Sequence, residues 1–268
     1  MSSPPSAAAP DATLLQELDP PPVGRERPDG RSNLVLACDH GGNAVPRALQ
    51  GLGLPQTELE RHIAIDIGAL GLSRGLSDAL DAPLVHQRYS RLVIDCNRDP
   101  KVASSRPETA DGTPVPGNRE LSAQDVARRV DEIFRPYQDA VAAVLDARQA
   151  NGAEPVLIAV HSFTPRLREA GDDRPWHIGV LFNRDPRVGR ALIEALRAEG
   201  DLVVGENQPY AVDDINDYTI PVHGERRGIP HVEIEVRQDL LADLAGQDAW
   251  ARRLARLLPD AVKAAGLG

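Results

Sequence analysis

The sequence predicts an α/β fold, and two similar stretches indicate where its functional site lies. The apolar runs Leu34–Ala37 and Pro155–Val160 have the length of buried strands, and segments of helical spacing separate such runs along the chain. His40 follows the first run and His161 follows the second. Because parallel strands end at the same edge of a sheet, this repetition indicates a metal-binding or catalytic site there.

Composition excludes several classes of protein. The length of 268 residues suits one large domain or two small ones, and a hydrophobic content of 41% supports a sizeable core. A net charge of -10 argues against nucleic acid and against anionic membrane surfaces as partners. The two cysteines, Cys38 and Cys96, lie in strand-like stretches, which fits a reducing cytoplasm without disulfides. No apolar run in the sequence approaches the roughly 20 residues of a membrane span.

The first 30 residues are expected to be a flexible segment that precedes a single domain over residues 31–268. They are rich in Pro, Ala and Ser and offer little that can be buried, apart from a short helix that could form near Leu14–Leu18. They also lack the basic and then apolar pattern of a signal peptide.

His40 stands in the polar, glycine-rich segment that follows the first apolar run. A rigid strand that leads into such a loop is where α/β proteins place groups that contact ligands. His40 is therefore the first candidate for a functional residue. The alternative is a turn in which Asp39 and Asn43 satisfy backbone groups and His40 has no role.

A helix is expected from Thr57 to about Leu80. Thr57 can cap it together with a glutamate three residues later, and apolar residues at helical spacing should face the core. His62 and Asp66 are four residues apart and would share one helix face. Asp66 lies between isoleucines, where a carboxylate is costly to bury unless a cation or metal pairs with it. The alternative places Asp66 on the helix surface, facing Arg61 or solvent.

A short buried strand is expected at Leu92–Ile94, with Arg91 before it and Arg98 after it. Alternation along this strand would place Arg91 and Asp95 on one face. A guanidinium group is a planar fork of donors that suits a carboxylate or phosphate, so the two arginines indicate anion recognition. The alternative is that both arginines pair internally with Asp95 and Asp99.

The remaining elements complete the expected sheet and the helices that cover it. Residues 99–120 form a loop of the kind that borders functional sites, and Ser122 caps a long helix that extends to about Gln149. The others are a strand at Trp176–Phe182, a helix over 185–199, a short strand at Asp201–Val204 and a C-terminal helix over 239–265.

The segment His231–Gln238 alternates polar and apolar side chains. Its polar face carries His231, Glu233, Glu235 and Arg237. If that face meets solvent, the segment is an edge strand without a functional role. If it meets the pocket, it places a glutamate beside a bound metal.

Several blocks of this sequence together resemble the N-formylglutamate amidohydrolase family. They occur in the family's order and are Cys38–Pro46, His62–Gly68, Ser90–Arg98, His161–Pro165, Asn207–Tyr210 and Ile234–Leu240. The resemblance implies a mixed β-sheet flanked by helices, a three-layer sandwich similar to the zinc carboxypeptidases and aspartoacylases. It also implies a metal-dependent hydrolase that cleaves the formyl amide of N-formyl-L-glutamate, a small dicarboxylate, to formate and glutamate.

The resemblance further implies a metal site. His40, Asp66 and His161 would bind Zn²⁺ or another divalent cation, because zinc takes imidazole nitrogen and carboxylate oxygen as ligands. In the carboxypeptidases a glutamate three residues after the first histidine binds zinc. That position is Asn43 in this sequence, a poor ligand, so Asp66 is expected to supply the oxygen.

Roles for other residues follow from the same resemblance. Glu235 would be the general base, with Glu233 as the alternative. Arg91 or His223 would assist the metal in stabilising the oxyanion. The expected substrate-binding residues are Arg91, Asn97, Arg98, Asn207, Tyr210 and Arg237.

Three alternatives stay open. The same site could act on another N-acyl amino acid or a small peptide, with a different carboxylate clamp. A cysteine could be the nucleophile, although Cys38 and Cys96 lie in apolar stretches where thiols are usually inert. The chain could also be a catalytically inactive ligand-binding homologue, but such a protein would be expected to have lost a ligand or the base, whereas His40, His161 and Glu235 are all present. The oligomeric state is not indicated.

Overall fold

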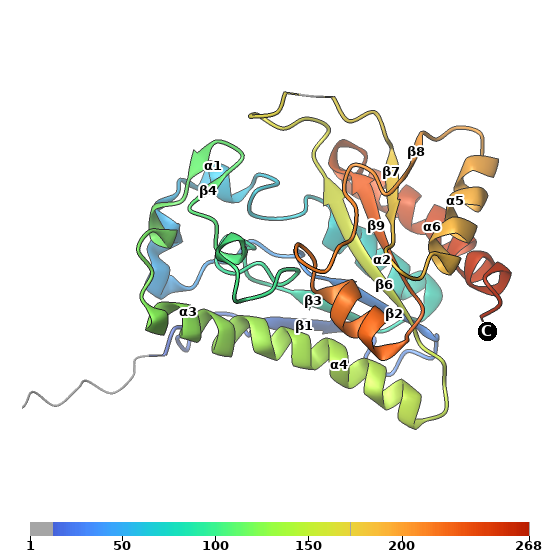
Figure 1. Cartoon of the computed structure of the whole chain (residues 1–268), viewed down its shortest axis with the longest axis horizontal. Coiled ribbons are helices and arrows are strands. Elements are labelled where there is room, and N and C mark those ends of the chain that lie inside the picture. Colours follow the sequence, from blue (N-terminus) through green and yellow to red (C-terminus); the bar gives the residue numbers. More distant parts are fainter. Residues whose placement is uncertain (1–12, 172, 268) are drawn as a thin grey trace, which may run out of the picture.

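A seven-stranded mixed β-sheet runs through the centre of the protein, in the order β1-β3-β2-β6-β9-β7-β8 (Figure 1). The structure is a computed structural model and describes residues 13–171 and 173–267. β3, β2, β6 and β9 are parallel to one another, β1 is antiparallel to β3, and the parallel pair β7–β8 is antiparallel to β9. The strands are β1 Val23–Glu26, β2 Leu34–Cys38, β3 Leu84–Gln87, β6 Val156–Phe163, β7 Ile178–Leu181, β8 Val204–Glu206 and β9 His231–Arg237.

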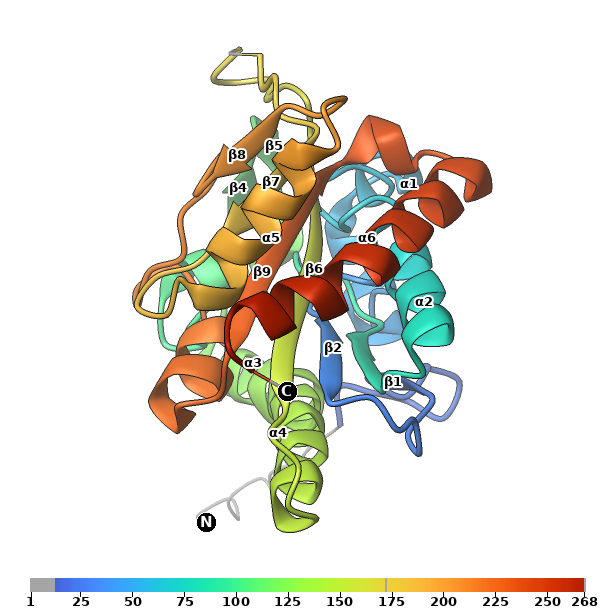
Figure 2. The same cartoon turned by 90° about the vertical axis from the view of Figure 1, so that its right-hand side faces the viewer.

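Helices cover both faces of this sheet and complete three layers (Figure 2). One face is covered by α2 Ala69–Leu80, α5 Arg187–Ala198 and α6 Leu244–Ala264. The other is covered by α3 Ala123–Arg129 and α4 Arg135–Ala150, which a π-helical turn at Val130–Phe134 connects. The predicted sandwich is therefore confirmed, and the predicted cap at Ser122 forms a capping box with Asp125.

The alternation of side chains along β6 and β9 decides which face carries the polar residues. In β6, Val160 packs in the core beneath α2, α5 and α6, whereas Ala159 packs in the core on the α4 side. His161 therefore points toward the α4 side. In β9, Ile234 belongs to the α2 side, so Glu233 and Glu235 also face the α4 side.

The helix expected from Thr57 to Leu80 is interrupted. A single helical turn, α1 Gln56–Leu59, has Pro55 at its N-cap position and no side-chain cap, so Thr57 lies inside the turn, and α2 begins only at Ala69. Gly68 precedes α2 with a φ of +78°, and a Cβ there would lie 2.4 Å from the Cβ of Leu241, so the chain turns sharply where only glycine fits. His62 and Asp66 therefore lie in the connection between the two helices and share no helix face.

The strand expected at Leu92–Ile94 does not form. Residues 91–98 make a series of buried turns, because side chains from elsewhere take the place of a strand partner. Arg129 donates to the carbonyl of Val93 at 2.9 Å, and Asn118 donates to the carbonyl of Leu92 at 2.9 Å. The loop expected over residues 99–120 contains the small hairpin of β4 Thr109–Ala110 and β5 Thr113–Pro114.

The flexible segment expected over residues 1–30 is corrected in part. Residues 1–12 lie outside the described residues, but Leu14 is buried and Val23–Glu26 is a strand of the sheet that pairs with β3. A bend at positions 14–15 and a turn at 17–18 replace the short helix that was an option there. Within the described residues, no helix has the length and apolar character needed to cross a membrane.

Candidate active site

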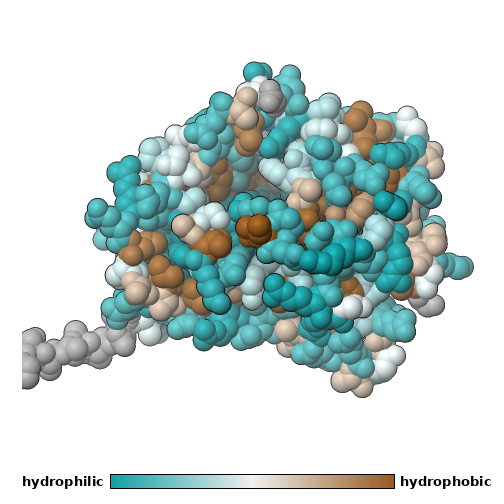
Figure 3. All heavy atoms as spheres, viewed as in Figure 1, coloured by the Kyte–Doolittle hydropathy of each residue, from teal (hydrophilic) through white to brown (hydrophobic). Residues whose placement is uncertain are grey.

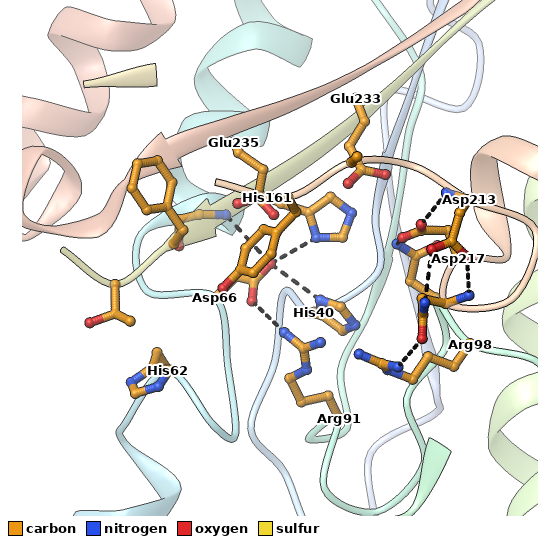
Figure 4. A pocket seen from close by; sticks show the side chains of 17 residues that line it. His40, His62, Asp66, Arg91, Arg98, His161, Asp213, Asp217, Glu233 and Glu235 are labelled. Atoms are coloured by element: carbon orange, nitrogen blue, oxygen red, sulfur yellow. Dashed lines mark hydrogen bonds and ion pairs between the residues drawn. The ribbon is translucent and has the colours of Figure 1, made fainter. Parts of the chain in front are cut away.

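A cavity of about 310 Å³ lies beside the carboxyl ends of β2, β6 and β9, on the α4 side of the sheet. The face of the molecule seen in Figure 3 is largely hydrophilic and is hollowed above its centre. Figure 4 shows the lining side chains, in which His161 stands between the two glutamates of β9 and Asp66. The two histidines that follow the predicted strands therefore meet at one edge of the sheet, as the sequence predicts.

Both histidines present Nδ1 to the same carboxylate oxygen. His40 follows β2, and its Nδ1 lies 3.2 Å from Oδ2 of Asp66. His161 lies near the end of β6, and its Nδ1 lies 2.8 Å from the same oxygen. The backbone N–H of Asp66 donates to the carbonyl of His40 at 3.1 Å, which fixes the connection before α2 against the loop after β2.

The far nitrogen of each histidine is held by a second carboxylate. Nε2 of His40 lies 2.7 Å from Oδ1 of Asp95, and Nε2 of His161 lies 3.1 Å from Oδ2 of Asp39. Asp39 also accepts a hydrogen bond from the hydroxyl of Thr219 at 2.6 Å. Such outer carboxylates fix the tautomer and the ring orientation of metal-binding histidines.

These residues fit a divalent cation. The ligand atoms of His40, Asp66 and His161 all lie within 4.8 Å of one another, and the three side chains are buried. Two imidazole nitrogens and a carboxylate oxygen are a donor set typical of catalytic zinc sites. Burial alone would raise the pKa of Asp66, but His40, His161 and Arg91 outweigh burial and keep it well below its usual range. Asp66 is therefore ionised and able to bind a cation.

Two buried glutamates of β9 complete this side of the cavity. Glu235 lies in register with His161, and Glu233 lies in register with Ala159. β9 pairs with β6 on one side and with β7 on the other, so it is an interior strand of the sheet. The alternative of a solvent-exposed edge strand is therefore wrong. Oε2 of each glutamate has no hydrogen-bond partner among the described residues.

Burial has different consequences for the two glutamates. It raises the pKa of Glu235 to about 7, with His161 partly offsetting the effect. It also raises the pKa of Glu233 well above its usual value, because burial disfavours the charged form of the carboxyl group. Glu235 can both accept and release a proton near neutrality, which is what a general acid–base group requires.

The family model of N-formylglutamate amidohydrolase matches residues 32–242 of the chain. The chain belongs to this family. It is therefore a hydrolase that acts on amide bonds, as the resemblance in sequence implied.

Solved structures agree with this membership in the amidohydrolase family. A gene product of Agrobacterium tumefaciens is 35% identical, with a TM-score of 0.89 over 93% of this chain and 98% of that chain. The N-formylglutamate amidohydrolase of Ralstonia eutropha is 23% identical, with a TM-score of 0.63 over 91% of this chain and 98% of that chain, and this likeness shows a common fold. No curated protein sequence matches the chain.

Four of the expected substrate-binding residues of this amidohydrolase line the cavity, namely Arg91, Asn97, Arg98 and Tyr210. Arg91 donates to Oδ2 of Asp95 from Nε at 3.1 Å and from Nη2 at 2.8 Å, and to Oδ1 of Asp66 from Nη1 at 3.2 Å. The internal pairing considered as an alternative for Arg91 therefore occurs, although part of its five-donor fork stays available to a ligand.

Three expected site residues lie elsewhere, and their assignments are corrected. His223 is buried in the turn Ile220–Gly224, with Nε2 2.8 Å from Oε1 of Gln138. The side chain of Asn207 accepts from the backbone N–H of Phe182 at 2.9 Å, so it fixes a turn. Arg237, the last residue of β9, does not line the cavity, and its Nε donates to Oδ1 of Asp239 at 2.7 Å.

Asn43 is also absent from the ligand cluster of the amidohydrolase. Its side-chain amide donates to the carbonyl of Leu59 at 2.9 Å, so it ties the loop after β2 to α1. Asp66, the carboxylate that the resemblance implied for this role, is the one that lies with His40 and His161 in a group that could hold a metal ion.

Sequence reasoning missed the outer carboxylates and one wall of the cavity. Asp39 and Asp95 hold the histidines, and the segment of residues 211–217 lines the cavity with Asp213, Asn216 and Asp217. Asn97 positions this segment, because its Oδ1 accepts from the backbone N–H of Tyr218 at 3.0 Å. The position of Asp39 next to His40 could have indicated its role in the sequence. The segment 211–217 shows no periodicity, so no sequence pattern places it at the cavity.

Proposed function

We propose that the protein hydrolyses the formyl amide of N-formyl-L-glutamate, or of a closely related N-acyl amino acid, to formate and the amino acid. The observation that carries this proposal is the convergence of two carboxylate-held histidines on Asp66, beside Glu235, which is in register with His161 and whose Oε2 has no hydrogen-bond partner among the described residues. Membership in the amidohydrolase family supports the reaction class.

His40, Asp66 and His161 would hold Zn²⁺ or another divalent cation. A cation there would polarise the amide carbonyl and lower the pKa of a bound water. Glu235 accepts the proton of the water that attacks the formyl carbon and passes it to the nitrogen when the carbon–nitrogen bond breaks. Formate and the free amine of the amino acid are the products.

Arg91 and Arg98 supply donors for the negative charges of substrate and intermediate. Both line the cavity, and Arg91 stands beside Asp66, where the reacting carbonyl oxygen would develop charge. Its remaining N–H groups would stabilise that oxygen. Asn97 would orient the substrate through the segment 211–217, which it holds in place.

The test combines metal analysis with a product assay on the purified protein. We expect about one divalent cation per chain and formate release from N-formyl-L-glutamate, with loss of the cation in the His161→Ala variant. A bound cation without formate release would indicate that the substrate is another N-acyl amino acid or a small peptide, hydrolysed by the same site residues. An absence of both, even after addition of Zn²⁺, would refute the proposal and favour an inactive ligand-binding homologue.

We also propose that the protein acts in the cytoplasm and as a single amidohydrolase domain. The two cysteines are buried and unpaired, which fits a reducing compartment. The domain would begin before residue 31, because β1 contributes a strand to the sheet.

A further inference from the structure

Arg174 lies beside the cavity and has no carboxylate partner among the described residues. Its Nη1 donates to the hydroxyl of Tyr210 at 2.7 Å, and its Cζ lies 4.8 Å from the centroid of the Tyr210 ring. Its backbone N–H donates to the carbonyl of Pro165 at 2.9 Å, which ties it to the chain that leaves β6. The guanidinium is thus held against Tyr210, and within residues 13–171 and 173–267 its Nε and Nη2 have no hydrogen-bond partner and can bind an anion.

The other arginines near the site are already neutralised or assigned. Asp66 and Asp95 pair with Arg91, and Asp239 pairs with Arg237. Arg98 lines the cavity, and its Nε lies 3.5 Å from Oδ2 of Asp95. A substrate with two carboxylates entering a cavity with five acidic lining residues needs a second cation besides Arg98.

Tyr210 connects Arg174 to the cavity. The tyrosine lines the cavity with 43% of its surface exposed, and desolvation of its hydroxyl, with a contribution from Glu235, raises its pKa, so the hydroxyl stays protonated. Because that hydroxyl oxygen already accepts a hydrogen bond from Arg174, its own hydrogen is left to donate, and it has no acceptor among the described residues. The pair therefore presents an N–H fork and an O–H donor to a single anion.

We propose that Arg174, together with Tyr210, binds the side-chain carboxylate of the substrate and makes the enzyme prefer dicarboxylic N-acyl amino acids. Arg98 pairs with Asp95, which holds the ligand His40, so Arg98 is assigned to the carboxylate nearer the reacting amide. Arg174 stands behind Tyr210, at the border of the cavity rather than among its lining residues, and is assigned to the farther one. This inference rests on the proposed function and adds the origin of its specificity.

The test compares N-formyl-L-glutamate with N-formyl-L-glutamine, which has the same shape but lacks the side-chain charge. In Arg174→Gln we expect kcat/KM for the glutamate substrate to fall roughly 30-fold, the effect of losing one charge-assisted hydrogen bond, and that for the glutamine substrate to change less than about threefold. Tyr210→Phe should lower the glutamate value by a smaller factor. Arg168→Gln is the matched control, because Arg168 follows β6 in the same connection and pairs with Glu58 at 3.4 Å.

The other possible outcomes distinguish a failure of the Arg174 subsite from a failure of the proposed function. An equal loss on both substrates would mean that Arg174 only positions Tyr210. A wild-type enzyme that hydrolyses both substrates equally well would refute the inference and leave the amidase proposal intact. If wild-type protein hydrolyses neither, the proposed function fails, and calorimetric titration with glutarate and with its monoamide tests the subsite alone. Tighter glutarate binding that Arg174→Gln abolishes would support the subsite, and equal binding of the two would refute it.

Discussion

At the scale of the residue, the site depends on which nitrogen of each histidine faces the cavity. Asp95 and Asp39 hold the Nε2 atoms, so Nδ1 of His40 and of His161 is directed at Asp66. The sequence identified both histidines and Asp66, but it suggested Asp39 only as a turn residue and Asp95 only as a partner of the arginines. Their position follows from turns and loops that bring residues 39, 95 and 161 together, which no local pattern encodes.

Removal of the charge behind one ligand should weaken cation binding without removing the ligand. In Asp39→Asn the side chain cannot accept from both Thr219 and His161, so His161 loses its fixed orientation. We expect the affinity for Zn²⁺ to fall about 10- to 100-fold, measured by competition with a chelating dye. Asp217→Asn is the control, because Asp217 lines the cavity and contacts neither ligand histidine in a hydrogen bond. Equal affinities for wild type and Asp39→Asn would contradict this role.

The two glutamates of β9 should respond differently to the same substitution. Burial raises the pKa of Glu233 well above its usual value and so favours its protonated form, whose shape Glu233→Gln keeps; this variant should keep kcat within about tenfold. Glu235→Gln removes the proton acceptor and should lower kcat by about 100-fold or more while retaining the cation. Steady-state rates and metal content measure both effects. The reverse order of losses would assign the base to Glu233.

At the scale of the element, the sequence predicts β6, β9 and the capped α3 correctly because each has a regular period or a cap of its own. It fails for residues 57–68 and 91–98, where apolar residues suggested a helix and a strand. In both segments contacts from distant chain override the local pattern, such as Leu241 against Gly68 and Arg129 against the carbonyl of Val93. These irregular segments carry Asp66, Arg91 and Asp95 to the site.

Gly68 offers a test of how this connection is built. Gly68 and Gly152 both have a φ of +78°, but a Cβ on Gly152 meets nothing within 4 Å, whereas one on Gly68 meets Leu241. Gly68→Ala should therefore lower the free energy of unfolding by about 1–3 kcal/mol more than Gly152→Ala does, as overpacking costs in cores. Urea denaturation of both variants measures the difference. Similar losses would show that the left-handed backbone alone requires glycine at position 68.

At the scale of the whole molecule, the site joins segments from across the chain, and a bound cation would link them. His40, Asp66 and His161 come from the end of β2, the connection before α2 and β6. A ligand that binds only the folded state stabilises it, by about 4 kcal/mol at a thousandfold excess over the Kd. The cation should therefore contribute to global stability and not only to activity.

Chelation should lower the melting temperature of wild-type protein. For a domain of this size, a loss of about 4 kcal/mol corresponds to a shift of roughly 10 °C, which readdition of Zn²⁺ should restore. Differential scanning calorimetry measures the shift, and His161→Ala should melt at the same temperature with and without the chelator. A wild-type melting temperature that does not respond to chelation would argue against a cation in this cluster.

The sequence by itself determined the α/β class, the strands that form β6 and β9 and the helix cap at Ser122, and its resemblance to a family implied the candidate ligands His40, Asp66 and His161. Regular periods and residue chemistry are local properties, so one chain is enough to read them. Only the tertiary structure decided that Asp39 and Asp95 hold the histidines, that His223, Asn207 and Arg237 lie outside the cavity, and that Arg174 stands beside Tyr210. Those relations join residues far apart in sequence through irregular segments, and packing alone sets their positions.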